Sequence, residues 1–469
     1  MIKAILTSTL LFGTAASAFA DSWTATQRLS GPTGGYQSQT GIDAKGEEIA
    51  VWVDQHPCGA SLNGCDDIVA KARVPGQGWG AMQRLAPFVP APLGSFGPKL
   101  KVSDNGTATY AWSDANGVLV ADKPWHGAPA KPIKFAPGPA DYQYATPFTL
   151  AEDHKGDAAL IVGDALSGTK LYLRPVGQAW RAVASPIPAS LPNASLFAVA
   201  LSVGGDVVVT WESFDKTYGS HRYYFQNFVL HAARLRAGSA TWENSGALAS
   251  VDGLSPTLNR VGHDSKVVLD DVGRAGVVWQ DLSAPFTNSP PLISTQTPGQ
   301  PWSRAVPLPT TGVVKGFGSD AAGNATALLL NYVAPIFQAV VTSGTLGSPT
   351  WTGSTLLSGK KSVFDFLYDK GIGLAVSPSG SAVVLWGTQS TGGGNDYNIQ
   401  HTIVNASTRP SATVPWRAPR TLTGGGGLLY GTITSVAASG VDYASATWEN
   451  EAHSGNLTYT DVTASVHQP

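Results

Sequence analysis

A tryptophan that recurs about every 56 residues is the feature that most constrains the fold of this chain. Seven intervals separate the first and last of these tryptophans over 393 residues. Each of the eight opens a short segment that ends on an apolar residue near a turn: Trp23, Trp79, Trp125, Trp180, Trp242, Trp302, Trp351 and Trp416. Self-similarity at a fixed period indicates a repeat protein, in which neighbouring units complete one another's core.

A second signature alternates with the first. A glycine in a small polar turn is followed six positions later by tryptophan: Gly46 and Trp52, Gly106 and Trp112, Gly205 and Trp211, Gly273 and Trp279, Gly380 and Trp386. Val162 and Leu329 replace the tryptophan in two further copies, and Trp448 marks the eighth. The residues between glycine and tryptophan are β-branched, aromatic or small, and these runs are too short for helices. They therefore predict strands.

Each repeat contains four predicted strands, which we name A to D. Strand A ends at the glycine turn, strand B ends at the second tryptophan, strand C follows, and strand D starts at the next repeat tryptophan. This pattern predicts an all-β fold, an eight-bladed β-propeller with four-stranded antiparallel blades, as one domain over residues 21–469. The chain begins with a D strand (Trp23 to Leu29) and ends with A, B and C strands (Tyr430 to Val466). The N-terminal strand should therefore close the last blade.

Residues 1–20 have the features of a secretory signal peptide. Lys3 supplies a positive charge, an apolar stretch follows, and Ala18-Phe19-Ala20 fits a cleavage site. Cleavage after Ala20 predicts a secreted or periplasmic protein without a membrane anchor, which we expect to be a monomer. Of 469 residues, 53 are glycine, 32 are proline and only 13% are charged, as expected for a turn-rich exported protein. The absence of a basic run argues against a nucleic-acid partner.

Two cysteines lie close together in the first repeat. In an oxidising compartment, the spacing of Cys58 and Cys65 predicts a disulfide that closes a small surface loop. A metal site needs more ligands than these two cysteines and His56, so we predict no metal. The sequence also lacks a phosphate-binding loop and a dinucleotide fingerprint, so we predict no cofactor.

The repeat resembles the kelch and Asp-box propeller families of secreted proteins. The likeness to kelch lies in the strand order and in the tryptophan that opens strand D. The likeness to the Asp-box, known from sialidases, lies in turns such as Ser103-Asp104-Asn105-Gly106 and Ser377-Pro378-Ser379-Gly380. The double glycine of kelch strands is absent, and the Asp-box aromatic normally follows its glycine sooner. The resemblance implies the fold alone, because propellers host lectins, lyases, hydrolases and scaffolds.

A polar residue recurs two positions after the end of strand B. The acidic examples are Asp54, Asp114, Asp164 and Asp281. The B–C and D–A loops share the face where propellers usually bind ligands, so a ring of acceptors there would suit sugar hydroxyls or a cation. Alternatively, each side chain caps its own loop by accepting backbone N–H groups. The strand-B tryptophans fit packing between blades better than ligand binding.

The fourth repeat is the irregular one. Its B–C loop concentrates charged and aromatic residues, and the following D–A loop adds two more candidates: Glu212, Asp215, Tyr218, His221, Arg222, Tyr223, Arg260 and His263. These side chains suit sugar binding by stacking and hydrogen bonding. They also suit a polysaccharide lyase, in which Arg neutralises a uronate and His or Tyr transfers a proton. A third interpretation is a long solvated hairpin.

These observations favour an exported propeller that binds a carbohydrate or another polar polymer at its channel face. The alternatives are a glycan-active enzyme, either polysaccharide lyase or glycoside hydrolase, and an envelope protein-interaction scaffold. The motifs of a sialidase and of a serine hydrolase are missing, so the enzyme question stays open. Repeated binding predicts similar polar groups on several blades, catalysis predicts one asymmetric cluster, and a scaffold predicts an exposed apolar patch without a pocket.

Overall fold

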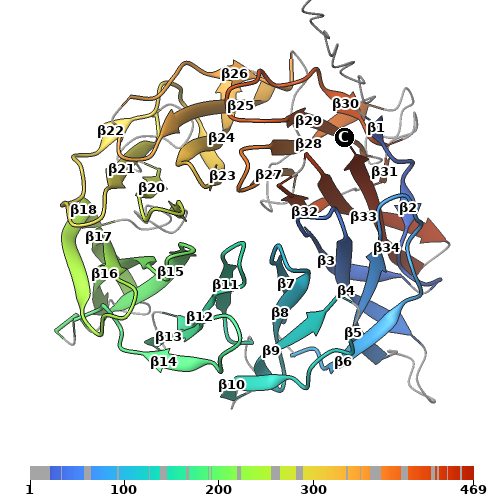
Figure 1. Ribbon diagram of the computed structural model, residues 1–469, viewed down its shortest axis with the longest axis horizontal. Coiled ribbons are helices and arrows are strands. Elements are labelled where there is room, and N and C mark those ends of the chain that lie inside the picture. Colours follow the sequence, from blue (N-terminus) through green and yellow to red (C-terminus); the bar gives the residue numbers. More distant parts are fainter. Residues whose placement is uncertain are drawn as a thin grey trace, which may run out of the picture.

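The computed structural model shows eight antiparallel sheets arranged as blades around a central channel (Figure 1). Each blade is four strands deep, and in blades 7 and 8 two short strands share the outermost place. The predicted eight-bladed propeller is therefore confirmed. The structure describes these residues: 22–32, 34–56, 65–91, 94–125, 127–137, 145–164, 168–188, 190–191, 193–218, 223–254, 265–280, 289–333, 336–348, 350–359, 371–391, 400–423, 428–429, 432–440, 442–454 and 457–468.

Each of blades 1 to 4 is built from four consecutive strands, with the first strand innermost. From the channel outwards they are: blade 1, β3 (Gly35–Ile42), β4 (Glu48–His56), β5 (Cys65–Arg73) and β6 (Gln83–Phe88); blade 2, β7 (Phe96–Val102), β8 (Thr107–Asp114), β9 (Gly117–Pro124) and β10 (Ile133–Pro137); blade 3, β11 (Phe148–Glu152), β12 (Ala158–Asp164), β13 (Gly168–Arg174) and β14 (Arg181–Val183); blade 4, β15 (Ala194–Leu201), β16 (Val207–Tyr218), β17 (Tyr223–Leu235) and β18 (Trp242–Leu254).

Blades 5 to 8 repeat this order, and the last blade borrows its outer strands from the N-terminus. From the channel outwards they are: blade 5, β19 (Lys266–Leu269), β20 (Ala275–Trp279), β21 (Leu292–Gln296) and β22 (Val306–Pro307); blade 6, β23 (Val313–Ser319), β24 (Asn324–Val333), β25 (Ile336–Thr345) and β26 (Thr355–Leu356); blade 7, β27 (Ile372–Val376), β28 (Ala382–Thr391), β29 (Gln400–Arg409), β30 (Arg420–Thr421) and β31 (Leu428–Leu429); blade 8, β32 (Thr432–Ala438), β33 (Ala444–Ser454), β34 (Leu457–Gln468), β1 (Ser22–Trp23) and β2 (Gln27–Arg28).

The ring closes as the sequence predicts. Trp23 of β1 is opposite His467 of β34, and Gln27 of β2 is opposite Ala464 of the same strand. Figure 1 accordingly shows the C-terminus beside the first strands of the chain. Closure pairs the outer edge of β34, which would otherwise leave the last blade with three strands.

The hydrophobic core is divided among the interfaces between blades. One cluster joins Val51 and Ile68 of blade 1 to Tyr110 and Trp112 of blade 2, and the other clusters repeat this arrangement around the ring. The strand-B tryptophans are at most 3% exposed: Trp52, Trp112, Trp211, Trp279, Trp386 and Trp448. Their packing between blades supports the prediction that they belong to the core.

Most repeat tryptophans of strand D lie before that strand and not within it. Strand β6 begins at Gln83, whereas Trp79 forms only an isolated bridge with Arg73. Two of these indoles instead lie beneath guanidinium groups, with ring centroids 5.2 Å from Cζ of Arg174 for Trp180 and 5.0 Å from Cζ of Arg409 for Trp416. This stacking holds the ring against the end of strand C, and regular pairing of strand D starts later.

The A–B turns all lie at one end of the channel and begin with a small acceptor. Asp153 shows its role, because its Oδ1 accepts hydrogen bonds from the N–H groups of Lys155, Gly156 and Asp157 at 2.8–3.0 Å. Gly156 has φ of 105°, which favours glycine over any residue with a Cβ. The first turn residue is buried in every blade: Asp43, Ser103, Asp153, Ser202, Asp270, Asp320, Ser377 and Ser439.

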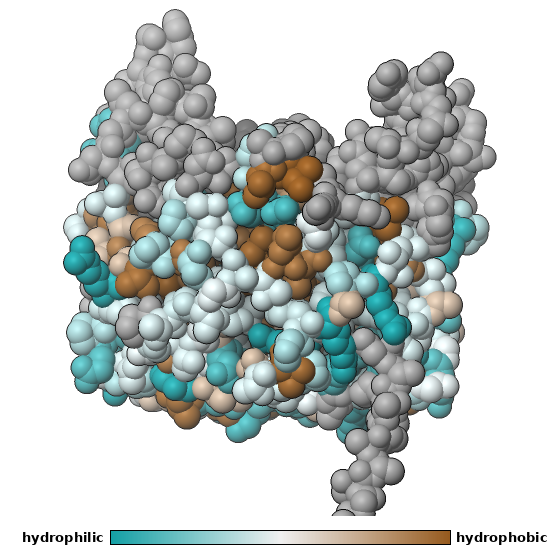
Figure 2. All heavy atoms as spheres, turned by 90° about the horizontal axis from the view of Figure 1, so that it is seen from above, coloured by the Kyte–Doolittle hydropathy of each residue, from teal (hydrophilic) through white to brown (hydrophobic). Residues whose placement is uncertain are grey.

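The surface of the described ring mixes polar and apolar groups. Figure 2 shows the ring edge-on, with apolar residues in groups that are separated by polar ones. Within the described residues, no helix is long and apolar enough to cross a bilayer.

Candidate functional site

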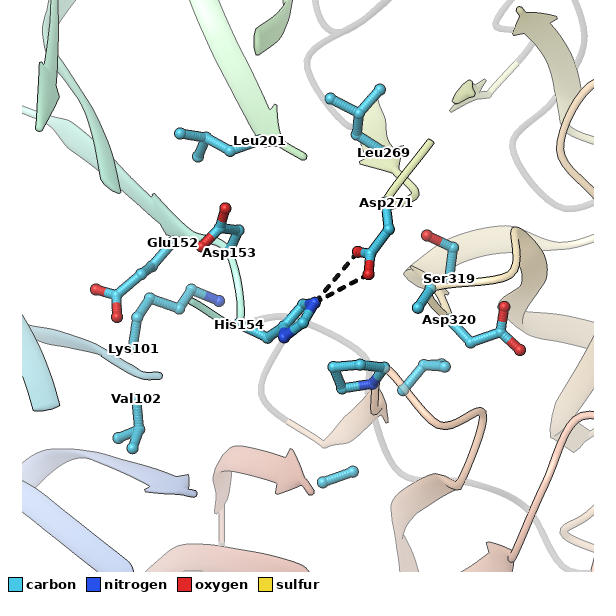
Figure 3. Close-up of a pocket in the computed structure, with 14 residues that line it drawn as sticks. Lys101, Val102, Glu152, Asp153, His154, Leu201, Leu269, Asp271, Ser319 and Asp320 are labelled. Atoms are coloured by element: carbon cyan, nitrogen blue, oxygen red, sulfur yellow. Dashed lines mark hydrogen bonds and ion pairs between the residues drawn. The ribbon is translucent and has the colours of Figure 1, made fainter. Parts of the chain in front are cut away.

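A cavity of about 240 Å³ occupies the channel at the end that carries the A–B turns. Its lining residues come from blades 2 to 8, and seven of the fourteen are polar or charged. Figure 3 looks into this cavity, which we call the channel pocket. The sequence predicted a ligand site at the opposite face, where the B–C and D–A loops lie, so the pocket is at an end of the channel that the sequence did not single out.

The channel pocket contains a residue that departs from the repeat. The last residue of the innermost strand occupies an equivalent position in each blade: Ile42, Val102, Glu152, Leu201, Leu269, Ser319, Val376 and Ala438. Only Glu152 is charged among the eight. Because seven blades form without a charge at this position, the fold does not require one. The departure therefore marks Glu152 as a candidate functional residue.

The carboxyl group of Glu152 is buried and accepts few hydrogen bonds. Its side chain is 1% exposed, and neither carboxylate oxygen accepts a hydrogen bond from a described residue. The nearest cation is Arg174, whose Nη2 lies 3.6 Å from Oε2. Burial raises the pKa of Glu152 to about 7, and the neighbouring Thr109 hydroxyl and Arg174 offset only part of this effect. Near neutral pH this carboxyl group is therefore close to half protonated.

Lys101 faces the same cavity from blade 2. It lies on the innermost strand and is exposed, whereas Leu100 next to it is buried, so the Lys101 side chain opens into the channel. Figure 3 shows its amine end pointing into the pocket. The surrounding channel wall lowers the pKa of Lys101 by desolvation, and the charge of Glu152 opposes that shift.

His154 joins three blades at the mouth of the channel pocket. Its Nδ1 lies 2.8 Å from Oδ2 of Asp104 in blade 2, and its Nε2 lies 3.2 Å from both carboxylate oxygens of Asp271 in blade 5. Figure 3 shows the contact with Asp271 across the mouth. Burial lowers the pKa of His154, but the two carboxylates outweigh burial and raise it overall. A protonated imidazole donates to both carboxylates at once, so this ring acts as a clamp between acids.

Two of the acidic residues predicted to follow strand B make local contacts. Asp54 accepts a hydrogen bond from Nε1 of Trp52 at 3.1 Å. Asp114 accepts from Nε1 of Trp112 at 3.3 Å and from the N–H of Asn116 at 2.7 Å. Both aspartates are buried. The bond from the N–H of Asn116 fits the interpretation in which Asp114 caps its own loop, whereas Asp54 accepts from the side chain of Trp52. A role of either aspartate in ligand binding stays a prediction.

The blade 4 candidates are only partly within the described structure. Glu212 is buried in β16, and Asp215 is exposed and accepts a hydrogen bond from Nδ2 of Asn227 at 2.7 Å. Tyr218, Tyr223 and Asp164 have a described backbone, at the ends of β16, β17 and β12. The remaining candidates lie outside the described residues: His221, Arg222, Arg260, His263 and Asp281. Their roles therefore stay predictions.

The described residues settle neither the predicted disulfide nor the predicted absence of a metal. Cys58 lies outside the described residues, so its pairing with Cys65 stays a prediction. Among the described side chains, no three histidine, cysteine, aspartate or glutamate residues come together in a way that could hold a metal ion.

An alignment of the eight A–B turns would have drawn attention to Glu152 and His154, which the tryptophan and glycine periodicity does not single out. Both residues flank the start of the third A–B turn, and aligning the eight turns would have placed Glu152 against apolar residues and Ser319. The contact of His154 with Asp271 has no such signal. It joins residues 117 positions apart, and only the closed ring brings those turns together.

Comparisons with known proteins give no family. No family model matches the chain, and no curated protein matches it. Among solved structures, the chain is similar to the BP39L lectin from Burkholderia pseudomallei, at 11% identity over 82% of this chain and 99% of that one, with a TM-score of 0.49. It is also similar to the polysaccharide lyase Uly1, at 9% identity over 84% and 93%, with a TM-score of 0.43.

A third similar structure is a mutant of the NanB sialidase from Streptococcus pneumoniae. It is 9% identical over 95% of this chain and 70% of that one, with a TM-score of 0.36. At such identities and scores, these similarities carry no inference about a ligand or an activity.

Proposed function

We propose that this protein is an exported propeller that binds a carbohydrate or another polar polymer in its channel. The observation that carries the proposal is the channel pocket, in which seven of the fourteen lining residues are polar or charged. Concave sites with a few converging polar groups suit recognition of a polar ligand, whereas a scaffold would need only a docking surface. Export rests on the signal-like residues 1–20 and predicts a mature N-terminus at Asp21.

Binding at the channel pocket can be tested by filling the cavity. Ala321 lines the pocket from the A–B turn of blade 6, at the turn position that His154 occupies in blade 3. An Ala321→Trp variant should lose binding on a glycan array and lose any ligand-dependent rise in melting temperature. Ala44→Trp is the matched control, because it makes the same change at the same turn position of blade 1, which does not line the pocket.

The same array addresses the opposite face. A variant carrying His221→Ala, Arg222→Ala and Tyr223→Ala removes three of the predicted blade 4 candidates and changes none of the described residues that line the channel pocket. If this variant loses binding and Ala321→Trp retains it, the ligand binds at the B–C face and the channel proposal is wrong. Binding of no glycan by any of the proteins would argue against the function itself.

A glycan-active enzyme is the second candidate, and one observation favours it. A carboxyl group with a pKa of about 7 is suited to transferring protons near neutral pH. Incubation of the wild-type protein with uronate-containing polysaccharides would reveal lyase activity as new unsaturated chain ends, and reducing-end assays would reveal hydrolysis. Turnover that Glu152→Gln abolishes, with the fold retained, would make the protein an enzyme instead of a binding propeller.

A further inference from the structure

The strands that surround the channel carry an excess of positive charge. Five residues of the eight innermost strands are charged, and four of them are lysines, which we call the channel lysines: Lys99, Lys101, Lys266 and Lys315. The fifth is Glu152, whose side chain is 1% exposed and lies beside Arg174. The innermost strands of blades 1, 4, 7 and 8 form without any charge, so the fold does not require these lysines.

The strand register places the channel lysines near one height in the channel. In every blade, one residue of the innermost strand pairs with the residue before the strand-B tryptophan or its replacement. These eight residues all lie three positions before the end of their strand and form a belt: Gln39, Lys99, Thr149, Ala198, Lys266, Gly316, Gly373 and Ser435. Two of the eight are lysines, three are uncharged and polar, and none is acidic. Lys315 directly precedes Gly316 as the extra residue of a β-bulge, and Lys101 follows Lys99 by two positions.

Two of the channel lysines have ammonium groups that are available to a ligand. Lys101 belongs to blade 2 and is exposed, and Lys266 belongs to blade 5 and is partly exposed. Neither forms an ion pair or a hydrogen bond with a described residue. His154 alone contacts both blade 2 and blade 5 across the channel mouth, so side chains from these two blades can reach a common space. Six N–H donors from the two ammonium groups can therefore meet one bound group.

The carboxylates at the A–B end do not neutralise these lysines, because the fold already uses them. Asp271 lies against His154, Asp320 accepts two hydrogen bonds from Asn324 at 2.7 Å, and Asp153 caps its own turn. All three follow the ends of the innermost strands. At a rise of about 3.3 Å per residue they lie roughly 10 Å or more from the belt. Physiological salt screens most of their attraction over such a distance, so the middle of the channel is positive.

We infer that the channel lysines bind the acidic group of an anionic saccharide, either a carboxylate or a sulfate. This inference rests on the proposed function and narrows its ligand class. Lys101 also lines the channel pocket, so the site extends that pocket towards the belt. Lysine acts as a mobile point charge, whereas arginine has a planar fork that selects a matching group. Binding should therefore depend on the negative charge of the ligand more than on the shape of its acidic group.

Isothermal titration of the wild-type protein with two matched pairs of oligosaccharides tests the ligand class. The first pair is a galacturonate oligomer and its methyl ester, and the second is a sulfated galactan oligomer and its desulfated form. Each acidic oligomer should bind about tenfold more tightly than its neutral partner in roughly 0.05 M salt, and only about twofold more tightly in roughly 0.5 M salt. Equal or tighter binding of the neutral partners would overturn the inference but leave the proposed function standing. If no oligosaccharide binds at all, both fail.

Variants separate the channel lysines from the general charge of the protein. A double variant, Lys101→Gln with Lys266→Gln, should reduce the preference for acidic oligomers to about threefold or less. Lys134→Gln with Lys170→Gln is the matched control, since it removes the same charge from exposed positions on β10 and β13, and it should keep the wild-type preference.

A third variant guards against loss of the fold. Lys101→Arg with Lys266→Arg retains both positive charges and should retain most of the preference. Melting temperatures close to that of the wild-type protein establish that each variant is folded. A folded Lys101→Gln, Lys266→Gln protein that keeps the full preference would overturn the inference, as would an equal loss in the control variant.

Discussion

An arginine at an equivalent position lies in two interfaces of the ring, the one between blades 2 and 3 and the one between blades 6 and 7. In the first, Nη2 of Arg174 donates to Oγ1 of Thr109 at 2.9 Å, and Arg174 also pairs with Asp122. In the second, Nη2 of Arg409 donates to Oγ1 of Thr326 at 3.0 Å, and Nη1 donates to Oγ of Ser343 at 3.3 Å. Each guanidinium also lies over the next repeat tryptophan.

The strand register shows that Arg174 and Arg409 occupy equivalent positions in their blades. Blade 3 aligns Glu152, Ala158 and Arg174 in one cross-strand row, and blade 7 aligns Val376, Ala382 and Arg409 in the equivalent row. The facing rows are Lys101, Thr109 and Asp122 in blade 2, and Gly318, Thr326 and Ser343 in blade 6.

The comparison separates structure from function. The arginine, its threonine and its tryptophan occur in both interfaces and therefore serve the packing of blades. Lys101 and Glu152 occur only in the first, where Lys101 opens on the channel pocket and the Glu152 side chain is buried next to Arg174. The chain thus contains its own control for what these two residues add.

Removing either arginine should lower the free energy of unfolding more than any other change considered, and the loss should differ between the two interfaces. Arg174→Ala leaves the carboxylates of Asp122 and Glu152 without their cation and should cost about 3–5 kcal/mol. Arg409→Ala removes hydrogen bonds to two hydroxyl groups and a longer-range attraction to Asp320, and should cost about 1–3 kcal/mol. Calorimetric melting of both variants measures the difference. Equal destabilisation would show that the acidic residues of the first interface do not depend on Arg174.

The Glu152 carboxyl group should make stability depend on pH. Its pKa is about 7 when folded, against an ordinary value of 4.5, so the folded protein binds more protons than the unfolded chain between these values. Stability should therefore fall as pH rises through this window, by on the order of 3 kcal/mol. Glu152→Val, which introduces the blade 7 residue, should flatten this dependence and exceed wild-type stability above about pH 8. If the stability of the wild-type protein does not change between pH 4.5 and 7, the raised pKa of Glu152 is contradicted.

The His154 clamp should add a smaller dependence of the same sign. Asp104 and Asp271 raise its pKa above 6.5 in the folded protein, so its contribution is present below that value and is lost as pH rises through the folded pKa. His154→Gln should cost about 1 kcal/mol at acidic pH and little at alkaline pH. Thermal melts at both extremes, together with an NMR titration of the ring, provide the measurement. A loss that is independent of pH would mean that the ring acts by packing alone.

Replacing the stacked tryptophans should cause the smallest loss of stability, and the loss should be the same in both interfaces. Trp180→Phe and Trp416→Phe keep an aromatic ring beneath each guanidinium but weaken the cation–π contact. Each substitution should lower stability by about 0.5–1 kcal/mol. Similar shifts in melting temperature would support one shared device, whereas a clearly larger loss at Trp180 would show that its interface depends on the ring in another way.

Much of the fold was predictable because the eight repeats share one pattern, so that a strand recognised in one repeat can be placed in the others. Trp52 and Trp112 marked strand B, and the early position of Trp23 predicted the closure of blade 8. The start of strand D was predicted less well, since Trp79 lies ahead of β6 and its place depends on a side chain from strand C. The channel pocket was not predicted, because its members lie on different blades and meet only when curvature and blade number bring the turns together.

The pairing of Trp23 with His467 has a consequence for the order of folding. Seven blades take all their strands from continuous stretches of chain, so each contains only contacts that are local in sequence. The eighth joins residues 444 positions apart and is assembled last during synthesis from the N-terminus. Until β34 arrives, the nascent arc has two open sides. Its final step is therefore a single long-range pairing that closes the arc into a ring.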